Sequence, residues 1–329
     1  MQAIPPIRRP AISVIICVWN PRPNIFSRTL DSIARQTLAA DQFELIVVDN
    51  NSQPALDAAW SQGDRPLRPI LLREPHQGLG HARCAAIAAA SADLLVFVDD
   101  DNFLDERYLQ TVLNLAESEP KIGLFGGISQ AELEHPIPRW KSAFLPYLGV
   151  RDYGPDPITV FADRWGQWEP IGAGMAARRE VAEKFVQMFR ALPHANLLGR
   201  SGAQLFSGDD ALFARAAYRT GYCCSYQPQL RLTHFLKRSR FEIKYLMRLM
   251  LGHGRSYVRL NRVLGKPTAP LMMRTAIARL LHRVLRDRLA GVITWFWDIG
   301  YALEKRNSGE PNGPEAQAIP EISSAEYGG

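Results

Sequence analysis

Short apolar runs alternate with stretches of helical spacing along the first third of the chain. The apolar runs are rich in Val, Ile, Leu and Phe, and they predict strands at 12–18, 43–48, 67–73 and 94–98. Apolar residues at helical spacing predict helices at 27–36, 80–92 and 105–119. Strands that alternate with helices in this way indicate an α/β fold, with a mostly parallel sheet covered by helices on both faces.

The pattern changes after residue 120. Frequent Pro and Trp residues between 121 and 170 indicate long loops, which often form the walls of a binding site. Helical spacing returns at 180–191 and 211–220, and again in a helical hairpin made of 237–264 and 271–305. The Gly-, Pro- and Ser-rich end is expected to be disordered. We therefore divide the 329 residues into an N-terminal extension (1–10), an α/β domain (11–240), a basic helical appendage (241–305) and a tail (306–329).

Three consecutive carboxylates, Asp99, Asp100 and Asp101, follow directly on the apolar run at 94–98. Because a buried strand cannot hold adjacent unpaired charges, the acids are expected where the strand leaves the core. That rim is where open α/β sheets bind ligands. Carboxylates packed so closely suit Mn²⁺ or Mg²⁺, ions that commonly also hold phosphate oxygens. A solvated acidic turn near the start of the next helix is the alternative.

Two common nucleotide-binding patterns are missing. The first strand leads into Trp19-Asn20-Pro21, without the G-x-G-x-x-G fingerprint of dinucleotide-binding proteins. Gly78-Leu79-Gly80 is a partial match only, since Arg83 stands where the third glycine belongs. No G-x-x-x-x-G-K-S/T sequence occurs. A dehydrogenase and a P-loop protein are therefore both disfavoured.

Other polar residues stand at the ends of predicted elements, and each has a functional and a structural interpretation. Asp49 ends the second strand and can accept hydrogen bonds from a base or ribose, or close a turn. Arg83 can bind a diphosphate or be a helix-surface charge. Either Asp209 or Asp210 can serve as a general base, whereas in the structural interpretation Ser207 or Asp209 caps the following helix. His234 can complete a metal site or be structural.

The net charge of +6 is distributed unevenly. Residues 237–288 hold fourteen Lys and Arg against two acids, a net +12, which leaves −6 for the remainder. Such asymmetry indicates an anionic partner surface, phospholipid or nucleic acid. Residues 271–305 also contain Trp295, Phe296 and Trp297, so a basic amphipathic helix at an anionic membrane is one interpretation. A helix pair packed on the α/β domain explains the pattern equally well. No recognised nucleic-acid module is visible, and we expect no nucleic-acid partner.

Location in the cell is inferred from what the sequence lacks. Cys17, Cys84, Cys223 and Cys224 have no metal-site spacing and suit a reducing compartment. The first ten residues do not have the pattern of a signal peptide. No apolar stretch reaches the ~18 residues of a membrane span. We expect a cytoplasmic protein, peripheral at the inner face of the cell membrane if the appendage binds lipid.

Taken in order, these segments resemble the family 2 glycosyltransferases, inverting enzymes with the GT-A fold. The resemblance extends from about Ile12 to His234, and its motif blocks are 13–20, 44–52, 78–83, 99–102, 172–180 and 208–215. Each block alone is weak, but six in this order are specific.

The resemblance assigns roles to individual residues. For the donor it implies Cys17 and Trp19 beside the nucleotide base, Asp49 in contact with the base, Arg83 near the diphosphate, Asp99 or Asp100 near the ribose, and Gly172 and Gly174 in a wall near the donor sugar. For the metal it implies Asp101 and His234. The resemblance also implies Asp210 as the catalytic base, with Asp209 as the competing assignment.

The implied reaction moves a sugar, with inversion, from a nucleotide-diphosphate donor to an acceptor hydroxyl. A UDP-sugar donor and a saccharide or lipid-linked acceptor, in cell-envelope polysaccharide or glycolipid synthesis, are expected. The Q-x-x-R-W signature of processive members is absent, which favours transfer of single sugars. A noncatalytic nucleotide-sugar-binding or membrane-scaffold protein is the main alternative. A nucleotidyltransferase would need a Gly-rich basic loop, which residues 19–23 do not supply.

Overall fold

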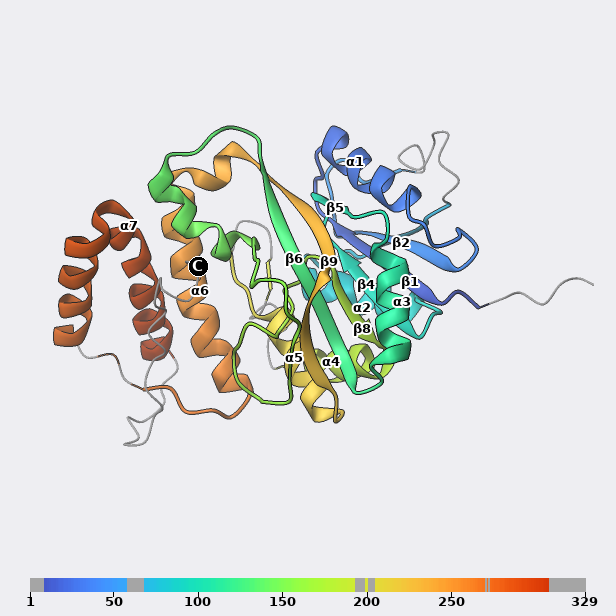
Figure 1. Ribbon diagram of the computed structural model, residues 1–329. Coiled ribbons are helices and arrows are strands. Elements are labelled where there is room, and N and C mark those ends of the chain that lie inside the picture. The colour runs from blue at the N-terminus through green and yellow to red at the C-terminus, as the bar shows by residue number, and fades with distance from the viewer. Residues whose placement is uncertain are drawn as a thin grey trace, which may run out of the picture. The chain divides into compact units, whose positions relative to one another are not determined.

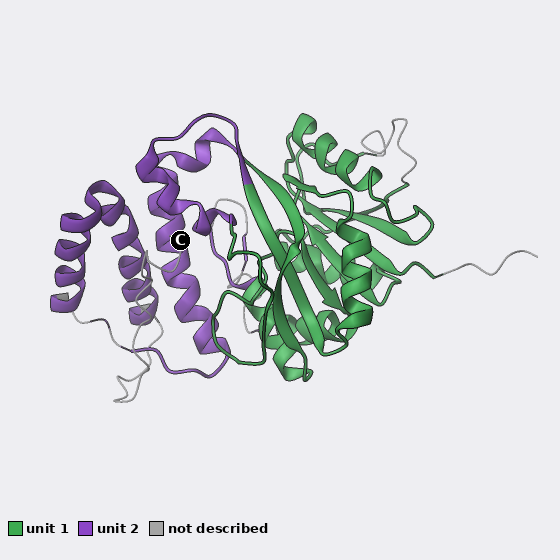
Figure 2. Ribbon diagram, viewed as in Figure 1, with its two compact units in different colours: residues 1–130, 151–191, 210–235 green, residues 131–150, 192–209, 236–329 purple. Residues whose placement is uncertain are grey.

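The structure is a computed structural model that describes residues 9–57, 68–192, 199–200, 205–269, 271 and 273–307. The chain forms two compact units (Figure 2). Unit 1 takes residues 1–130, 151–191 and 210–235, and unit 2 takes 131–150, 192–209 and 236–329. The boundary expected at residue 240 is close to the last of these divisions, and the four-part division of the chain stays a prediction.

A single nine-stranded sheet runs through the described residues (Figure 1), in the order β3-β2-β1-β4-β8-β6-β9-β5, with β7 also paired to β9. The strands are β1 (Ile12–Val18), β2 (Phe43–Asp49), β3 (Ile70–Arg73), β4 (Leu94–Val98), β5 (Asn102–Leu104), β6 (Ile122–Leu133), β7 (Ile158–Val160), β8 (Met175–Arg178) and β9 (Cys223–Leu236). The first four strands are parallel, as expected. Strand β8 is antiparallel to β4 and to β6.

The helices follow the predicted order closely. They are α1 (Pro23–Ala34), α2 (Leu79–Ala89), α3 (Tyr108–Ser118), α4 (Arg179–Arg190), α5 (Asp209–Arg219), α6 (Ile243–Val263) and α7 (Met273–Asn307), with short 3₁₀ turns η2 (Arg139–Phe144), η3 (Pro146–Leu148) and η5 (Arg238–Phe241). Helix α1 begins four residues before its expected start, because Pro23 stands at the first helical position. Proline suits that position because its φ is already helical and its missing N–H needs no partner there.

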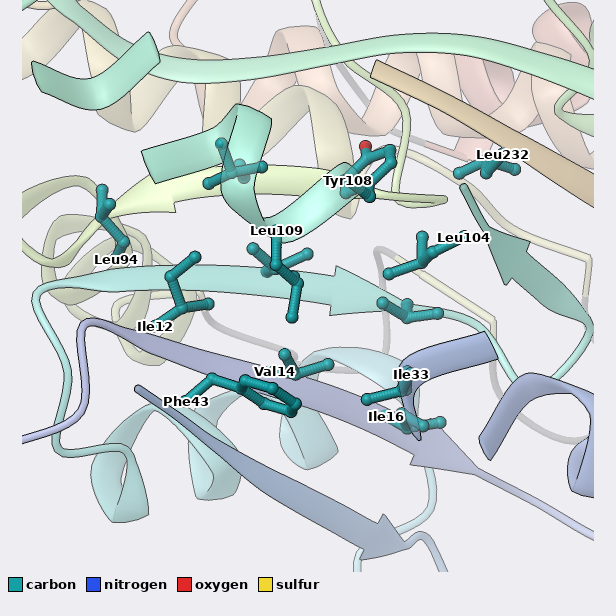
Figure 3. Packing of buried hydrophobic residues seen from close by; sticks show 14 of the residues in the cluster. Ile12, Val14, Ile16, Ile33, Phe43, Leu94, Leu104, Tyr108, Leu109 and Leu232 are labelled. Carbon is teal, nitrogen blue, oxygen red and sulfur yellow. The ribbon is translucent and has the colours of Figure 1, made fainter. Parts of the chain in front are cut away.

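The main core lies between the sheet and helices α1 and α3. Alternate residues of β1, among them Ile12, Val14 and Ile16, pack in one cluster with Ile33 of α1 and Leu109 of α3 (Figure 3). Helix α2 packs against β1 and β2 as well. Successive side chains of a strand point to opposite faces of the sheet. In β1 the residues on both faces are buried. This double coverage explains why β1 and β4 are continuous apolar runs.

The expectation that residues 121–170 form only loops is wrong. Strand β6 occupies residues 122–133, and Gly123, Gly126 and Gly127 obscure the apolar pattern that would predict a strand there. These glycines are required by close packing. A Cβ on Gly123 would lie 2.4 Å from Tyr222 Cβ, and one on Gly127 would lie 2.1 Å from the carbonyl oxygen of Leu230. A glycine within a strand often marks such an approach.

Unit 2 contains the two predicted helical segments as α6 and α7, and the second of them consists of two helical arms. The helices approach closely at glycine: a Cβ on Gly254 would lie 2.0 Å from the carbonyl oxygen of Trp297. Helix α7 is interrupted at Arg288, which has φ 49° and ψ −122°. Among the described residues, no helix combines the length and the apolar character needed to cross a membrane. The tail 308–329, expected to be disordered, lies outside the described residues.

Candidate active site

The carboxyl ends of β1, β2 and β4 meet at one edge of the sheet, because these three strands are parallel and adjacent. Trp19 follows β1, Asp49 ends β2 and Asp99 follows β4. Trp19 is 45% exposed, which leaves its indole ring open to a flat ligand ring. Cys17, the penultimate residue of β1, is half-buried. The fold therefore brings these sequence-predicted residues to one edge.

Asp49 is buried, and both of its carboxylate oxygens accept backbone hydrogen bonds. The N–H of Ser52 lies 2.9 Å from Oδ1, and the N–H of Leu56 lies 3.1 Å from Oδ2. Asp49 thus shapes the loop after β2, as in the turn interpretation. Its contact with a nucleotide base stays a prediction.

Asn50 is a site residue that sequence reasoning missed. Its side-chain amide donates to the carbonyl oxygens of Glu74 and His76, at 3.2 and 2.8 Å, and its Oδ1 accepts the N–H of Gly78 at 2.7 Å. Gly78 is the residue before α2. Asn50 therefore ties the end of β2 to the start of the helix that carries Arg83. An Asn after a strand indicates a turn, but the sequence does not show which distant residues its side chain will hydrogen-bond.

Arg83 is 2% exposed, so the helix-surface interpretation of this residue is wrong. Its guanidinium lies 5.5 Å from the ring centre of Phe97 on β4 and 5.8 Å from that of Phe213 on α5, within range of cation–π attraction. A Cβ on Gly172 would lie 2.5 Å from Arg83 Nη2. The Arg83 side chain therefore occupies the space that a larger side chain at position 172 would need.

Gly174, at the other end of the same loop, has φ +71°, a backbone conformation that glycine adopts most readily. A Cβ there would lie 2.5 Å both from the hydroxyl oxygen of Tyr108 and from Leu232 Cδ2. The Tyr108 hydroxyl donates to the Gly174 carbonyl. The Gly172–Gly174 loop is thus fixed between α2, α3 and β9.

The acidic turn after β4 is held from two sides. The N–H of Asn102 donates to the Asp99 carbonyl, and Asn102 Oδ1 accepts the N–H of Asp99, each at 3.1 Å. From α1, the Thr29 hydroxyl donates to the Asp100 carbonyl at 2.9 Å. From β9, the N–H of Phe235 donates to the Asp101 carbonyl at 2.9 Å. The backbone of this turn is therefore held by its neighbours, while the Asp99 and Asp100 side chains are partly exposed.

Asp101 and His234 face each other inside the protein. The Nε2 atom of His234 lies 3.4 Å from Asp101 Oδ1, and the side chains are 6% and 5% exposed. Antiparallel pairing of β5 with β9 sets this contact, since Asn102 is in register with His234. The Nδ1 atom of His234 is buried without a hydrogen-bond partner among the described residues.

This pair fits a divalent metal in part. Ligands on neighbouring corners of an octahedral Mg²⁺ or Mn²⁺ site lie about 3 Å apart, close to the separation of these two atoms. Among the described residues, no group of three or more His, Cys, Asp and Glu side chains is arranged to hold an ion. Any ion at Asp101 and His234 would therefore need further oxygen ligands from a bound molecule or water.

Helix α5 begins at the two candidate bases. Asp209 is 6% exposed, whereas Asp210 is partly exposed and accepts the N–H of Ala211 at 2.8 Å. Asp210 belongs to unit 1, together with Arg83 and Asp101, and Asp209 is grouped with unit 2. A base must reach its substrate, so the more accessible carboxylate is the better placed.

Sequence reasoning also missed a buried contact between Arg215 of α5 and the carboxyl group of Glu169. The Arg215 guanidinium donates to Glu169 and also, at 2.7 Å, to Asp163. The Tyr218 hydroxyl donates to Glu169 at 3.2 Å. Burial raises the pKa of Glu169 to about 8, a rise that the Arg215 charge opposes and the Asp210 charge increases. An arginine placed between the apolar residues Phe213-Ala214 and Ala216-Ala217 of α5 was the available signal, because arginine is almost never fully buried unless it is paired.

Comparison with known proteins relates this arrangement to one family. The family described as Glycosyl transferase family 2 matches residues 13–186. An N-acetylglucosaminyltransferase of Bradyrhizobium diazoefficiens is 26% identical over 309 residues, which cover 87% of this chain and 60% of that protein. A validoxylamine A glucosyltransferase of Streptomyces hygroscopicus subsp. jinggangensis is 34% identical over 154 residues, 45% of this chain and 36% of that protein. The chain thus spans less than two thirds of either relative.

The architecture is also found in solved structures. A mannosyltransferase from Pyrobaculum calidifontis, in complex with GDP-Man and Mn²⁺, aligns with 93% of this chain and 78% of its own, at a TM-score of 0.55 and 18% identity. That likeness concerns the fold. The family match covers just over half of the chain, including β1, β4 and the acidic turn. The chain therefore belongs to glycosyl transferase family 2, and it has the GT-A fold.

Proposed function

We propose that this protein is an inverting glycosyltransferase, which moves a sugar from a nucleotide-diphosphate donor to an acceptor hydroxyl. One observation carries the proposal: Arg83 is buried between Phe97, two residues before Asp99, and Phe213, three residues after Asp210. A single cation thereby links the strand that ends in the acidic turn to the helix that carries the candidate base. The family membership supports the same assignment.

The donor nucleotide occupies the edge of the sheet formed by the ends of β1, β2 and β4. The exposed indole of Trp19 stacks on the base, with Cys17 beside it and Asp49 at the edge of the base. Asp99 or Asp100 receives the ribose hydroxyls. The Arg83 fork binds the diphosphate, because a guanidinium can donate two parallel hydrogen bonds to phosphate oxygens. Gly172 and Gly174 form the wall beside the sugar.

Asp101 and His234 are the residues that would hold Mn²⁺ or Mg²⁺. When bound, such an ion neutralises the charge that develops on the leaving diphosphate. Two protein ligands are enough if phosphate oxygens and water supply the others, which is the usual pattern for Mg²⁺ at substrate phosphates. The placement of His234 Nε2 at 3.4 Å from Asp101 Oδ1, with both side chains buried, supports a shared ligand role.

Asp210 acts as the general base in this scheme. Its carboxylate removes the proton from the acceptor hydroxyl as that oxygen attacks the anomeric carbon, on the face opposite the leaving diphosphate. One displacement inverts the configuration and needs no covalent sugar–enzyme intermediate. Asp209 is less suited because it is buried.

For the donor and acceptor we propose a UDP-sugar and a saccharide or lipid-linked alcohol, used in cell-envelope polysaccharide or glycolipid synthesis. A relative of this chain, the succinoglycan biosynthesis protein ExoM of Rhizobium meliloti, is 24% identical over 76% of this chain. That relative's part in succinoglycan biosynthesis supports a polysaccharide product. The reaction would take place at the cytoplasmic face of an anionic membrane, contacted through residues 237–305, and no nucleic acid takes part.

A thermal-shift panel tests the donor site. UDP, GDP, dTDP and CMP are each added with and without Mn²⁺ to the wild-type protein, to Asp101→Ala and to the control Glu106→Gln, an exposed acid nearby. We expect stabilisation by one nucleotide, UDP, that requires Mn²⁺ and is lost only in Asp101→Ala. Stabilisation by GDP instead would correct the donor. Absence of any shift would favour a noncatalytic scaffold.

A further inference from the structure

The first arm of α7, residues 273–287, exposes a stripe of large apolar side chains. Ile277 is 48% exposed, Leu281 59% and Leu285 86%. Their spacing of four residues places them on one face of the helix. Single exposed apolar residues are common on protein surfaces. A row of three along one face of a helix instead indicates an interaction surface.

The same arm is basic along this face. No acid occurs between 273 and 286. Arg274, His282 and Arg286 are exposed. Arg274 stands three residues before Ile277, and the other two directly follow Leu281 and Leu285. All three therefore border the stripe on the same side. Asp287 pairs with Arg286 at 2.9 Å, beside the interruption at Arg288. An apolar row with a basic border is typical of helices that lie in the headgroup region of a membrane.

The other two arginines of the arm have a different role. Arg279 and Arg283 turn inward, where they lie 3.2 and 2.5 Å from the carboxylate oxygens of Asp298. The Asp298 side chain is fully buried. These ion pairs hold the first arm of α7 against the second arm and thereby fix which face is presented outward.

The aromatic residues that suggested a membrane contact in the sequence do not form this face. Trp297 is 6% exposed and stacks on Tyr301 with ring centres 5.6 Å apart. The indole N–H of Trp295 donates to the Ala276 carbonyl at 3.1 Å. The aromatic residues of the second arm thus serve the core of unit 2, and the outward apolar surface comes from the aliphatic residues of the first arm.

We propose that the Ile277–Leu281–Leu285 face binds an anionic phospholipid surface, with the aliphatic stripe in the interface and Arg274 and Arg286 on lipid phosphates. Charge complementarity favours lipid over a second copy of the chain, because pairing two such faces would bring basic borders together. The inference specifies the membrane contact of the proposed function, and it rests on that function only for the location of the acceptor. Binding to lipid is measurable without any donor.

Co-sedimentation with vesicles tests the proposal. Full-length protein is mixed with vesicles of phosphatidylglycerol and phosphatidylcholine, or of phosphatidylcholine alone, and the partition coefficient is measured. We compare Ile277→Gln/Leu281→Gln/Leu285→Gln with Leu303→Gln, a control at a 40% exposed leucine on the second arm of the same helix. We expect the triple variant to lose at least about tenfold in partitioning to anionic vesicles, and the control to retain wild-type binding.

Three results would overturn the proposal. Wild-type protein that partitions equally into both vesicle types, or a triple variant that partitions like wild type, would each do so. So would a wild-type dimer in light scattering that dissociates in the triple variant, since the face would then join two copies. Circular dichroism and Tm verify that both variants fold. The nucleotide thermal shift is measured in parallel, so that loss of lipid binding with retained nucleotide binding separates this inference from the proposed reaction.

Discussion

Glu169 and Arg215 are in direct contact, and both side chains are 2% exposed. The pair joins α5, six residues after Asp209, to the segment that leads into the Gly172–Gly174 loop. Arg215 has a second carboxylate partner, Asp163, whose side chain is 47% exposed. The two acids therefore share one guanidinium but differ greatly in their access to water.

Because of this difference, we predict that the free energy of unfolding depends on pH through the ionisation of Glu169. Its pKa is raised to about 8, chiefly by burial, from an ordinary value of 4.5. Between these values the folded chain holds a proton that the unfolded chain has released. The free energy of unfolding therefore falls as pH rises through this window, by at most about 1.4 kcal/mol per pH unit. Glu169→Gln should remove this contribution to the slope.

Urea unfolding at intervals from about pH 5 to pH 9 measures the effect. The free-energy curves of wild type and Glu169→Gln should converge toward low pH and diverge toward high pH. The matched control is Asp163→Asn, which removes the exposed partner of the same arginine and should give a curve parallel to wild type. Parallel curves for wild type and Glu169→Gln would show that the carboxyl of Glu169 does not titrate in this range.

Gly172→Ala should weaken donor binding more than it weakens folding. The added Cβ would lie 2.5 Å from Arg83 Nη2, so the guanidinium must move away from the place where we put the diphosphate. The displaced group is the end of a long side chain, which limits the cost to stability. We expect about a tenfold rise in the nucleotide Kd, measured by calorimetry, with Tm changed by a few degrees at most.

A double-mutant cycle with Arg83→Lys identifies the cause of that loss. Lysine keeps the charge but lacks the fork, so this substitution alone should also weaken binding. If Gly172→Ala acts through the guanidinium, the two losses will be strongly non-additive. Additive losses would mean that the alanine disturbs the sugar wall and not Arg83.

The fold was largely predictable because its elements carry strong local signals. The apolar runs of β1, β2 and β4 were located to within a residue. Strand β6 was missed because three of its residues are glycines, and the reason for those glycines lies in residues such as Tyr222 and Leu230, far away in the sequence. Tertiary packing overrode the local pattern there.

The candidate site was predictable only where residues follow strand ends. The acidic turn could be located because charges directly follow a buried strand. Asn50 and Glu169 could not be located in this way, because their roles depend on hydrogen-bond partners 24 to 46 residues away in the sequence. Arg83 was found, but its burial depends on Phe97, Phe213 and Gly172 meeting around it in the folded chain.

Metal dependence should respond to both members of the Asp101–His234 pair. Asp101→Asn removes the carboxylate ligand, and His234→Gln removes the imidazole whose Nε2 atom lies 3.4 Å from it. We expect the Mn²⁺ concentration for half-maximal nucleotide binding to rise at least about tenfold in each variant, with the larger effect for Asp101→Asn. Titration of Mn²⁺ at fixed nucleotide measures this. An unchanged midpoint in His234→Gln, with folding intact, would assign His234 a structural role.

Asp210→Asn should abolish turnover while it leaves donor binding intact. Asparagine has the same shape but cannot accept the proton of the acceptor hydroxyl, so kcat should fall by a factor on the order of 10² to 10⁴. The donor Kd should stay within about twofold, because no contact of Asp210 with the donor is proposed. Asp209→Asn is the matched comparison: it changes the neighbouring, buried carboxylate in the same way and should lower kcat much less. Single-turnover assays with a radiolabelled donor sugar measure both variants. If Asp209→Asn instead loses the greater part of kcat, the base is Asp209, and α5 must present its first residue to the acceptor.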